Sequence, residues 1–102
     1  MTVNAYIPNV DSNNVSVINT ATNAVIATIA VGINPISATV TPDGSKAYIS
    51  NENSNNISVI NTATNTITAT ITGLTFPQGA AFSPDGTKAY VTQASTSNTV
   101  AV

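Results

Sequence analysis

The sequence contains no cysteine, no histidine and no tryptophan, and only 6% of its 102 residues are charged. Without cysteine the chain has neither disulfides nor thiolate metal sites. Without histidine it has no imidazole to act as a general base, so a Ser-His-Asp triad cannot form. We therefore expect a protein that is not an enzyme, with no catalytic residues, no metal site and no cofactor.

Positive charge is equally scarce, because Lys46 and Lys88 are the only basic residues and the net charge is −2. Nucleic-acid binding depends on cations that displace counterions from phosphates, so we expect no nucleic-acid partner. No hydrophobic run approaches the ~18 residues of a membrane span, so we expect no membrane partner. Residues Met1–Asn4 lack the basic and apolar regions of a secretory signal. Any signal would lie outside this sequence, which leaves the localisation unknown.

What the sequence does contain is a repeat. Ala5-Tyr6-Ile7 returns as Ala47-Tyr48-Ile49 and as Ala89-Tyr90-Val91, a spacing of 42 residues each time. Overlaying residues 5–46 on 47–88 needs no gap and matches roughly 24 of the 42 positions. We therefore expect residues 1–102 to form one repeat-built unit, with repeats at 5–46 and 47–88 and a partial repeat at 89–102.

Short β-rich runs alternate with clusters of Asn, Ser, Thr, Pro and Gly every 8–12 residues, which is typical of an all-β fold. Four strands fit in one period. A segment at Ala94–Ser97 shifts the last run by one residue and indicates an insertion. The expected strands are Ala5–Pro8, Val15–Asn19, Ala24–Ala30, Ile36–Thr41, Ala47–Ser50, Ile57–Asn61, Thr66–Thr72, Gly79–Ser83, Ala89–Thr92 and Val100–Val102.

The connections have the chemistry of turns. Thr41–Gly44 and Ser83–Gly86 both contain Pro-Asp-Gly. Proline presets φ, the aspartates Asp43 and Asp85 can bond the backbone, and Gly44 and Gly86 allow positive φ. We assign these four residues to turn formation.

Asparagines mark the other connections. Asn13-Asn14 and Asn55-Asn56 lie between apolar runs, and asparagine tolerates the left-handed conformation of tight turns. Asn19–Asn23 and its copy Asn61–Asn65 form a longer polar corner whose side-chain oxygens can satisfy loop amides. All these connections are short enough to join antiparallel neighbours.

Broken alternation indicates burial on both faces of each sheet. Ile18 and Ile60 place an apolar group on the face shared by Ser16 and Ser58, and Val25–Ile29 shows the same pattern. Four-stranded sheets covered on both sides and repeated along a chain are expected to stack face to face, as in a β-propeller. The small-residue runs Ser37–Val40 and Gly79–Ala81 suit the crowded innermost strand, and Val25–Ile29 the outermost.

The repeats resemble the YVTN-type β-propeller repeats of archaeal and bacterial surface-layer and secreted proteins. The resemblance covers nearly the whole chain, notably Ala47–Asn51, Asn56–Asn65, Ile67–Ile71, Pro77–Gly79 and Ser83–Lys88. It implies seven-bladed rings that serve as surface-exposed scaffolds or binding modules, with related rings acting as enzymes. An extracellular or cell-surface location is implied in the same way.

The chain itself holds about two and a half blades, beginning at a second strand and closing at a third. Stacked repeats generally need three or more units, so we expect the ring to be completed by homo-oligomerisation. If the inner strand Gly79–Ser83 completes the opening blade of a neighbouring copy, a trimer gives six blades and a tetramer eight. We favour the trimer. Ala5–Pro8 and Ala89–Thr92 would then compete for one position.

Several residues are candidates for interfaces or sites. Tyr6, Tyr48 and Tyr90 recur at one blade position and, with Ala80 and Phe82, are assigned to packing between sheets rather than to sugar stacking. The segment Asn51–Asn55 has oxygen ligands at alternate positions but lacks the glycine and the distal glutamate of a calcium loop.

We therefore predict a structural, self-assembling propeller fragment, whose features suit an engineered or excised chain while its natural or engineered origin stays open. The alternative is a surface module that binds carbohydrate or peptide on the rim formed by Asn9–Asn14 and Asn51–Asn56. A weaker alternative is a piece of a propeller enzyme whose catalytic residues lie in other blades.

Overall fold

The computed structural model describes residues 4–94 and 100–101, and these form strands joined by turns and two short 3-10 helices. The all-β prediction is confirmed. Neither of the helical segments among these residues is long or apolar enough to cross a membrane. The strands are β1 (Asn4–Asn9), β2 (Asn14–Asn19), β3 (Ala24–Ala30), β4 (Pro35–Val40), β5 (Lys46–Asn51), β6 (Asn56–Asn61), β7 (Thr66–Ile71), β8 (Pro77–Phe82), β9 (Ala89–Gln93) and β10 (Val100–Ala101); the 3-10 helices are η1 (Val10–Ser12) and η2 (Glu52–Ser54).

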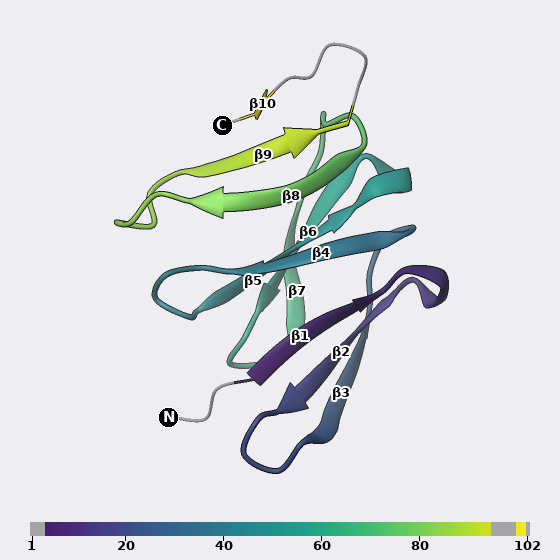
Figure 1. Cartoon of the computed structure of the whole chain (residues 1–102), viewed down its shortest axis with the longest axis vertical. Coiled ribbons are helices and arrows are strands. Elements are labelled where there is room, and N and C mark those ends of the chain that lie inside the picture. The colour runs from purple at the N-terminus through teal and green to yellow at the C-terminus, as the bar shows by residue number, and fades with distance from the viewer. Residues whose placement is uncertain (1–3, 95–99, 102) are drawn as a thin grey trace.

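The strands form three antiparallel sheets (Figure 1). Their orders are β1-β2-β3, β4-β5-β6-β7 and β8-β9-β10, called here the first, second and third sheets. The innermost strand of the second sheet, β4, contacts both β1 and β8, so the sheets stack in chain order. This arrangement is consistent with adjacent propeller blades, the first without an inner strand and the third without an outer one. Closure into a ring stays a prediction.

The last strand carries a register offset. Val100 pairs with Thr92, whereas Ile57 pairs with Ser50 at the corresponding place in the second sheet. The β9–β10 connection is therefore one residue longer than its counterpart, as the shift in the sequence predicts. Residues 95–97 of the predicted insertion Ala94–Ser97, together with Val102, lie outside the described residues.

A β-bulge explains the broken alternation of β2 and β6. The pairing register shifts between Val17 and Ile18, and again between Val59 and Ile60. A bulge inserts one residue and turns the following side chain towards the other face. Ile60 is consequently fully buried and packs against the first sheet.

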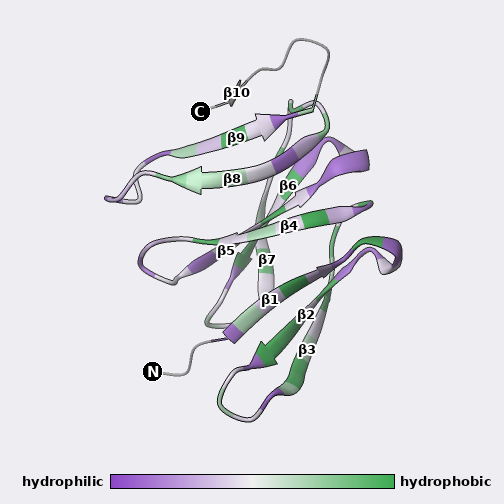
Figure 2. Cartoon of the chain, viewed as in Figure 1, coloured by the Kyte–Doolittle hydropathy of each residue, from purple (hydrophilic) through white to green (hydrophobic). Residues whose placement is uncertain are grey.

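The outermost strands are less covered than the sequence predicts. Figure 2 shows apolar residues along β3, yet Val25 is 60% exposed and Ile26 50% exposed. Only Ile29 of this strand is buried. The expectation that both faces of Val25–Ile29 are covered is thus wrong, because the contacts between sheets are concentrated on β1, β4, β5 and β8.

Candidate functional site: the sheet interfaces and the turn pocket

The apolar core lies between the sheets. The first sheet contributes Tyr6, Val15, Val17 and Ile29 to one cluster. The second sheet contributes Ala47, Ile49 and Ile60 to the same cluster, and all three are fully buried. The stability of the stack therefore depends on these interfaces, because burial of aliphatic side chains is the main favourable term in packing.

Tyr6 closes this interface with a polar contact. Its ring is buried, and its hydroxyl donates a hydrogen bond to Oδ1 of Asn65 at 2.8 Å. Burial raises the pKa of the Tyr6 hydroxyl above its usual value of 10.0. Asn65 belongs to the corner between β6 and β7, so the contact joins the first sheet to the outer part of the second.

The second interface repeats the first with changes. Ile57 and Val59 of the second sheet pack with Val91 of the third, and Tyr48, Ala80 and Leu74 lie against them. The rings of Tyr48 and Phe82 meet edge to face, with centroids 4.8 Å apart and planes at 84°. The structure thus places Tyr48, Ala80 and Phe82 at a sheet interface.

Tyr90 and Ile7 occupy the two outer faces of the stack. Tyr90 is 41% exposed, whereas Tyr6 at the same repeat position is 8% exposed. Ile7 is 44% exposed, whereas its counterpart Ile49 is fully buried. Side chains at equivalent repeat positions are therefore buried between two sheets of the chain and exposed on the outer faces of the first and third sheets.

On the rim formed by Asn9–Asn14 and Asn51–Asn56, asparagine side chains form hydrogen bonds from each sheet to the next. Asn13 Oδ1 accepts from the backbone N–H of Asn34 at 3.0 Å. Asn55 Oδ1 accepts from the N–H of Phe76 at 2.9 Å. Both asparagines adopt the left-handed conformation, which aims their side chains across the interface. Sequence reasoning assigned them to turns and missed this second role, although their recurrence at the 42-residue spacing was a signal.

Asn51 holds a buried corner of the same rim. Its Nδ2 donates to Oδ1 of Asn56 and to Oγ of Ser58, both at 2.9 Å. Residue 32, which lies against Asn51 in space, must be glycine, because a Cβ on Gly32 would lie 2.8 Å from the Asn51 side chain. The rim that sequence reasoning offered for ligand binding thus has several amides committed to internal contacts.

The calcium-like segment Asn51–Asn55 folds into η2 and its flanking residues. The Glu52 carboxylate accepts a hydrogen bond from Gln78 Nε2. Residues 4–94 and 100–101 hold no group of three or more His, Cys, Asp or Glu side chains that could bind a metal ion.

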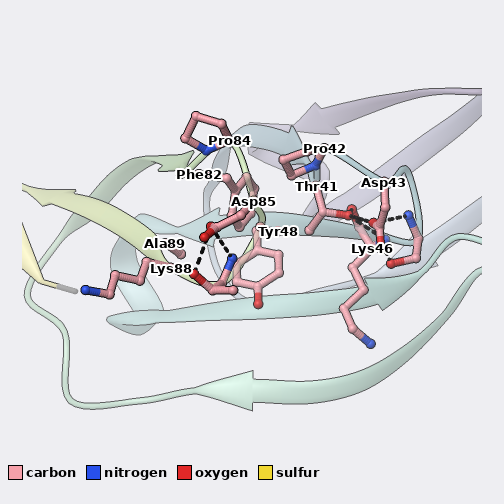
Figure 3. Close-up of a pocket in the computed structure, with 13 residues that line it drawn as sticks. Thr41, Pro42, Asp43, Lys46, Tyr48, Phe82, Pro84, Asp85, Lys88 and Ala89 are labelled. Atoms are coloured by element: carbon pink, nitrogen blue, oxygen red, sulfur yellow. Dashed lines mark hydrogen bonds between the residues drawn. The ribbon is translucent and has the colours of Figure 1, made fainter.

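A cavity of ≈ 460 Å³ opens between the two Pro-Asp-Gly turns (Figure 3). Its lining includes the aromatic residues Tyr48 and Phe82 and both lysines, Lys46 and Lys88. Both glycines of the turns have positive φ, 77° at Gly44 and 73° at Gly86. We call this cavity the turn pocket.

The carboxylates of the turn pocket are occupied within their own turns. Asp43 accepts from the N–H and hydroxyl of Ser45, at 3.0 and 2.8 Å, and from the Thr41 hydroxyl at 2.7 Å. The Ser45 backbone N–H, followed by these hydroxyls, lowers the Asp43 pKa to about 2.

Asp85 is held in the same way by the Ser83 hydroxyl and by Thr87, and its pKa is also about 2. Ionised carboxylates that accept several hydrogen bonds are suited to holding a turn rather than to exchanging a proton.

A family model described as a YNCE-like β-propeller matches residues 2–102. A propeller family is therefore confirmed, whereas the YVTN-type or surface-layer subfamily is not supported. No protein with curated annotation matches the chain.

Several solved structures resemble the chain. Hydrazine synthase from Kuenenia stuttgartiensis is 31% identical with a TM-score of 0.85, over 88% of this chain and 26% of that one. A functionally unknown protein from Desulfotomaculum acetoxidans is 25% identical with a TM-score of 0.74, over 90% and 34%. The dihydro-heme d1 dehydrogenase NirN is 17% identical with a TM-score of 0.75, over 90% and 20%, which supports the fold alone. The chain thus spans between a fifth and about a third of these proteins.

Proposed function

The chain belongs to the YNCE-like β-propeller family, and from this premise we propose that its main activity is to assemble with copies of itself into a closed propeller ring. The role is structural or interactive, without catalysis. The observation that carries the proposal is the contrast between Ile7, 44% exposed, and Ile49, fully buried at the same repeat position. Burying such a face against another copy has the same hydrophobic driving force as the internal interface.

The strand inventory supports one mode of closure. The first sheet has three strands and no inner one, whereas β8 is an inner strand at the other end of the chain. If β8 of one copy pairs with β1 of the next, it completes the first sheet of that copy. Each copy then supplies eight strands and therefore two blades. Three copies then close a six-bladed ring, and four copies close an eight-bladed one. We favour the trimer.

The chemistry of the site supports a non-catalytic role. Asp43 and Asp85 are each held by hydrogen bonds within a turn, so neither is available as a general base. Histidine and cysteine are absent from the sequence. The chain resembles the structure of a hydrazine synthase but covers only 26% of that protein chain.

Sedimentation velocity of the 102-residue chain across a dilution series tests the proposal. We expect one discrete oligomer at high concentration that converts to monomer on dilution. A monomer at every concentration would contradict self-assembly. A broad, growing distribution would contradict closure, because stacking that does not close gives open filaments.

The turn pocket favours a second candidate function, binding of a carbohydrate or peptide. Two aromatic residues, two lysines and a cavity of ≈ 460 Å³ provide an apolar wall with polar groups at its edge. Screening the folded oligomer on a glycan array and a peptide panel tests this function. Hits that weaken when Phe82 is changed to alanine would support it, and the absence of any hit would remove it.

A further inference from the structure

A second cavity, of ≈ 530 Å³, lies between the second and third sheets. Tyr48, Ile71 and Leu74 line it from the second sheet and its following loop. Ala89 and Val91 line it from β9. The Tyr48 hydroxyl makes no hydrogen bond to any residue in the described part of the chain. We call this cavity the Tyr48 socket.

The corresponding position between the first and second sheets is filled. Tyr6, which stands 42 residues before Tyr48, donates its hydroxyl to Asn65 of the corner Asn61–Asn65. That corner has a defined geometry, in which the Asn65 N–H bonds the Asn61 carbonyl at 2.7 Å and Asn65 has φ 55°. A socket of this kind therefore takes an Asn-Thr-Ala-Thr-Asn corner.

The chain carries a second copy of the same corner. Asn19–Asn23 is identical in sequence to Asn61–Asn65. It has the same geometry, because the Asn23 N–H bonds the Asn19 carbonyl at 2.7 Å and Asn23 has φ 59°. Asn19–Asn23 joins β2 to β3 of the first sheet, the sheet that exposes Ile7. The corner is thus preformed on the face that needs a partner.

We propose that the Tyr48 socket receives the Asn19–Asn23 corner of a second copy of this chain, with the Tyr48 hydroxyl donating to Oδ1 of Asn23. This inference rests on the proposed self-assembly and names the contact that selects its geometry. The proposed contact repeats an interface already formed within the chain, because the Tyr6 hydroxyl donates to Oδ1 of Asn65 in the same way.

The incoming sheet has to take the place of β9. In the second sheet the corner Asn61–Asn65 follows β5 and β6, which pair beside the inner strand β4. For Asn19–Asn23 to reach the socket, β1 of the second copy therefore pairs with β8 and displaces β9. The exchange keeps the apolar part of the lining that β9 supplies, because Ala5 and Ile7 replace Ala89 and Val91.

A simpler arrangement makes a different prediction. If the first sheet of one copy stacks on the intact third sheet of another, the corner Asn19–Asn23 meets Tyr90 instead of Tyr48. Tyr48 and Tyr90 therefore distinguish strand exchange from simple stacking.

The first experiment compares the dissociation of the oligomer formed by Tyr48→Phe, Tyr90→Phe and Asn23→Gly variants. Glycine keeps the positive φ of position 23 and removes the acceptor. We expect Tyr48→Phe and Asn23→Gly each to weaken every interface about fivefold, with no further loss in the double variant, and Tyr90→Phe to have no effect. The matched control Asn65→Gly removes the internal contact of Tyr6 and is expected to leave the number of copies unchanged.

The second experiment introduces a pair of cysteines, and because the chain has no cysteine of its own, no other disulfide can form. Ala80 of β8 pairs with Val91 of β9, so the two backbones are close enough for a disulfide. Because β1 of the second copy takes the place of β9, Ile7 of that copy takes the place of Val91 and pairs with Ala80. Oxidised Ile7→Cys/Ala80→Cys is expected to give covalent oligomers, and the control Ala80→Cys/Val91→Cys a covalently closed monomer.

The outcomes separate the inference from the function on which it rests. An oligomer weakened by Tyr90→Phe, unaffected by Tyr48→Phe and not crosslinked through positions 7 and 80 would overturn the Tyr48 socket while leaving self-assembly intact. A wild-type chain that stays monomeric would overturn both.

Discussion

At the scale of single residues, asparagine sets much of the geometry. Within residues 4–94 and 100–101, five of the six residues other than glycine with positive φ are asparagines: Asn13, Asn23, Asn34, Asn55 and Asn65. Asparagine tolerates this conformation better than other side chains, and it can bond nearby amides at the same time. Asn13 and Asn55 use that freedom to reach the next sheet. One residue type thus forms the turns and also joins the sheets.

The turn aspartates give the stability of the fold a pH dependence. Because the pKa of Asp43 and Asp85 is about 2 in the folded chain and 3.8 ordinarily, folding favours the ionised form. Their contribution is complete above about pH 4 and is lost as the pH falls towards about 2. We expect Tm from circular dichroism to fall over that window. The variant Asp43→Asn/Asp85→Asn should show a shallower fall, and an unchanged slope would contradict the assignment.

Ile49 and Ile7 form a matched pair that separates folding from assembly. Ile49→Ala empties a fully buried position within the chain and is expected to cost about 2–5 kcal/mol of folding stability. Ile7→Ala changes a residue that is 44% exposed, so we expect little effect on the monomer. If assembly buries Ile7, the same change weakens each interface by about tenfold or more. Equilibrium denaturation and sedimentation measure the two effects, and an unaffected oligomer would contradict burial of Ile7.

At the scale of strands, the edge of β1 that would face an inner strand lacks one backbone N–H donor, at Pro8. Pro8 occupies the repeat position of Ser50 and Thr92. The Thr41 N–H to Lys46 carbonyl bond, followed by the alternation of an antiparallel ladder, directs the N–H at position 50 towards the inner strand. Proline has no N–H to donate there, which is typical of an edge strand.

Replacing Pro8 with serine therefore tests whether β1 pairs with an inner strand of another copy. Pro8→Ser restores one ladder hydrogen bond, and we expect each interface to tighten about fivefold in sedimentation experiments. Ser50→Pro is the matched control, because it removes the corresponding bond within the second sheet and should lower Tm. Unchanged assembly in Pro8→Ser would indicate that β1 stays an open edge.

The elements were largely predictable from the sequence, and the contacts between them were not. Proline, aspartate and glycine at fixed offsets mark turns by local chemistry alone, so the hairpin at Thr41–Gly44 was foreseeable. The exposure of Val25 was not, because it depends on which strands the neighbouring sheet contacts rather than on alternation along one strand. The bond from Asn34 to Asn13 likewise joins residues 21 positions apart on different sheets, which no local pattern specifies.

At the scale of the whole molecule, the stack of three sheets presents two unlike ends. The face with Ile7 corresponds to the buried face with Ile49, whereas the other end of the stack carries the inner strand β8 paired with β9. Under the proposed exchange, β1 of one copy pairs with β8 of another, and such head-to-tail contacts form a ring if the rotation between copies closes. Pro8 and the competing strand β9 both oppose that pairing, so we expect assembly to depend on concentration.

Native mass spectrometry of the 102-residue chain can decide whether copies of the chain close into a ring, because it counts the copies in each particle. We predict a single assembly of three chains, about 31 kDa from three masses of 10.3 kDa. The same spectrum recorded after dilution should show the trimer and the free chain without a series of larger species. A chain that remains at 10.3 kDa at tens of micromolar would contradict the account.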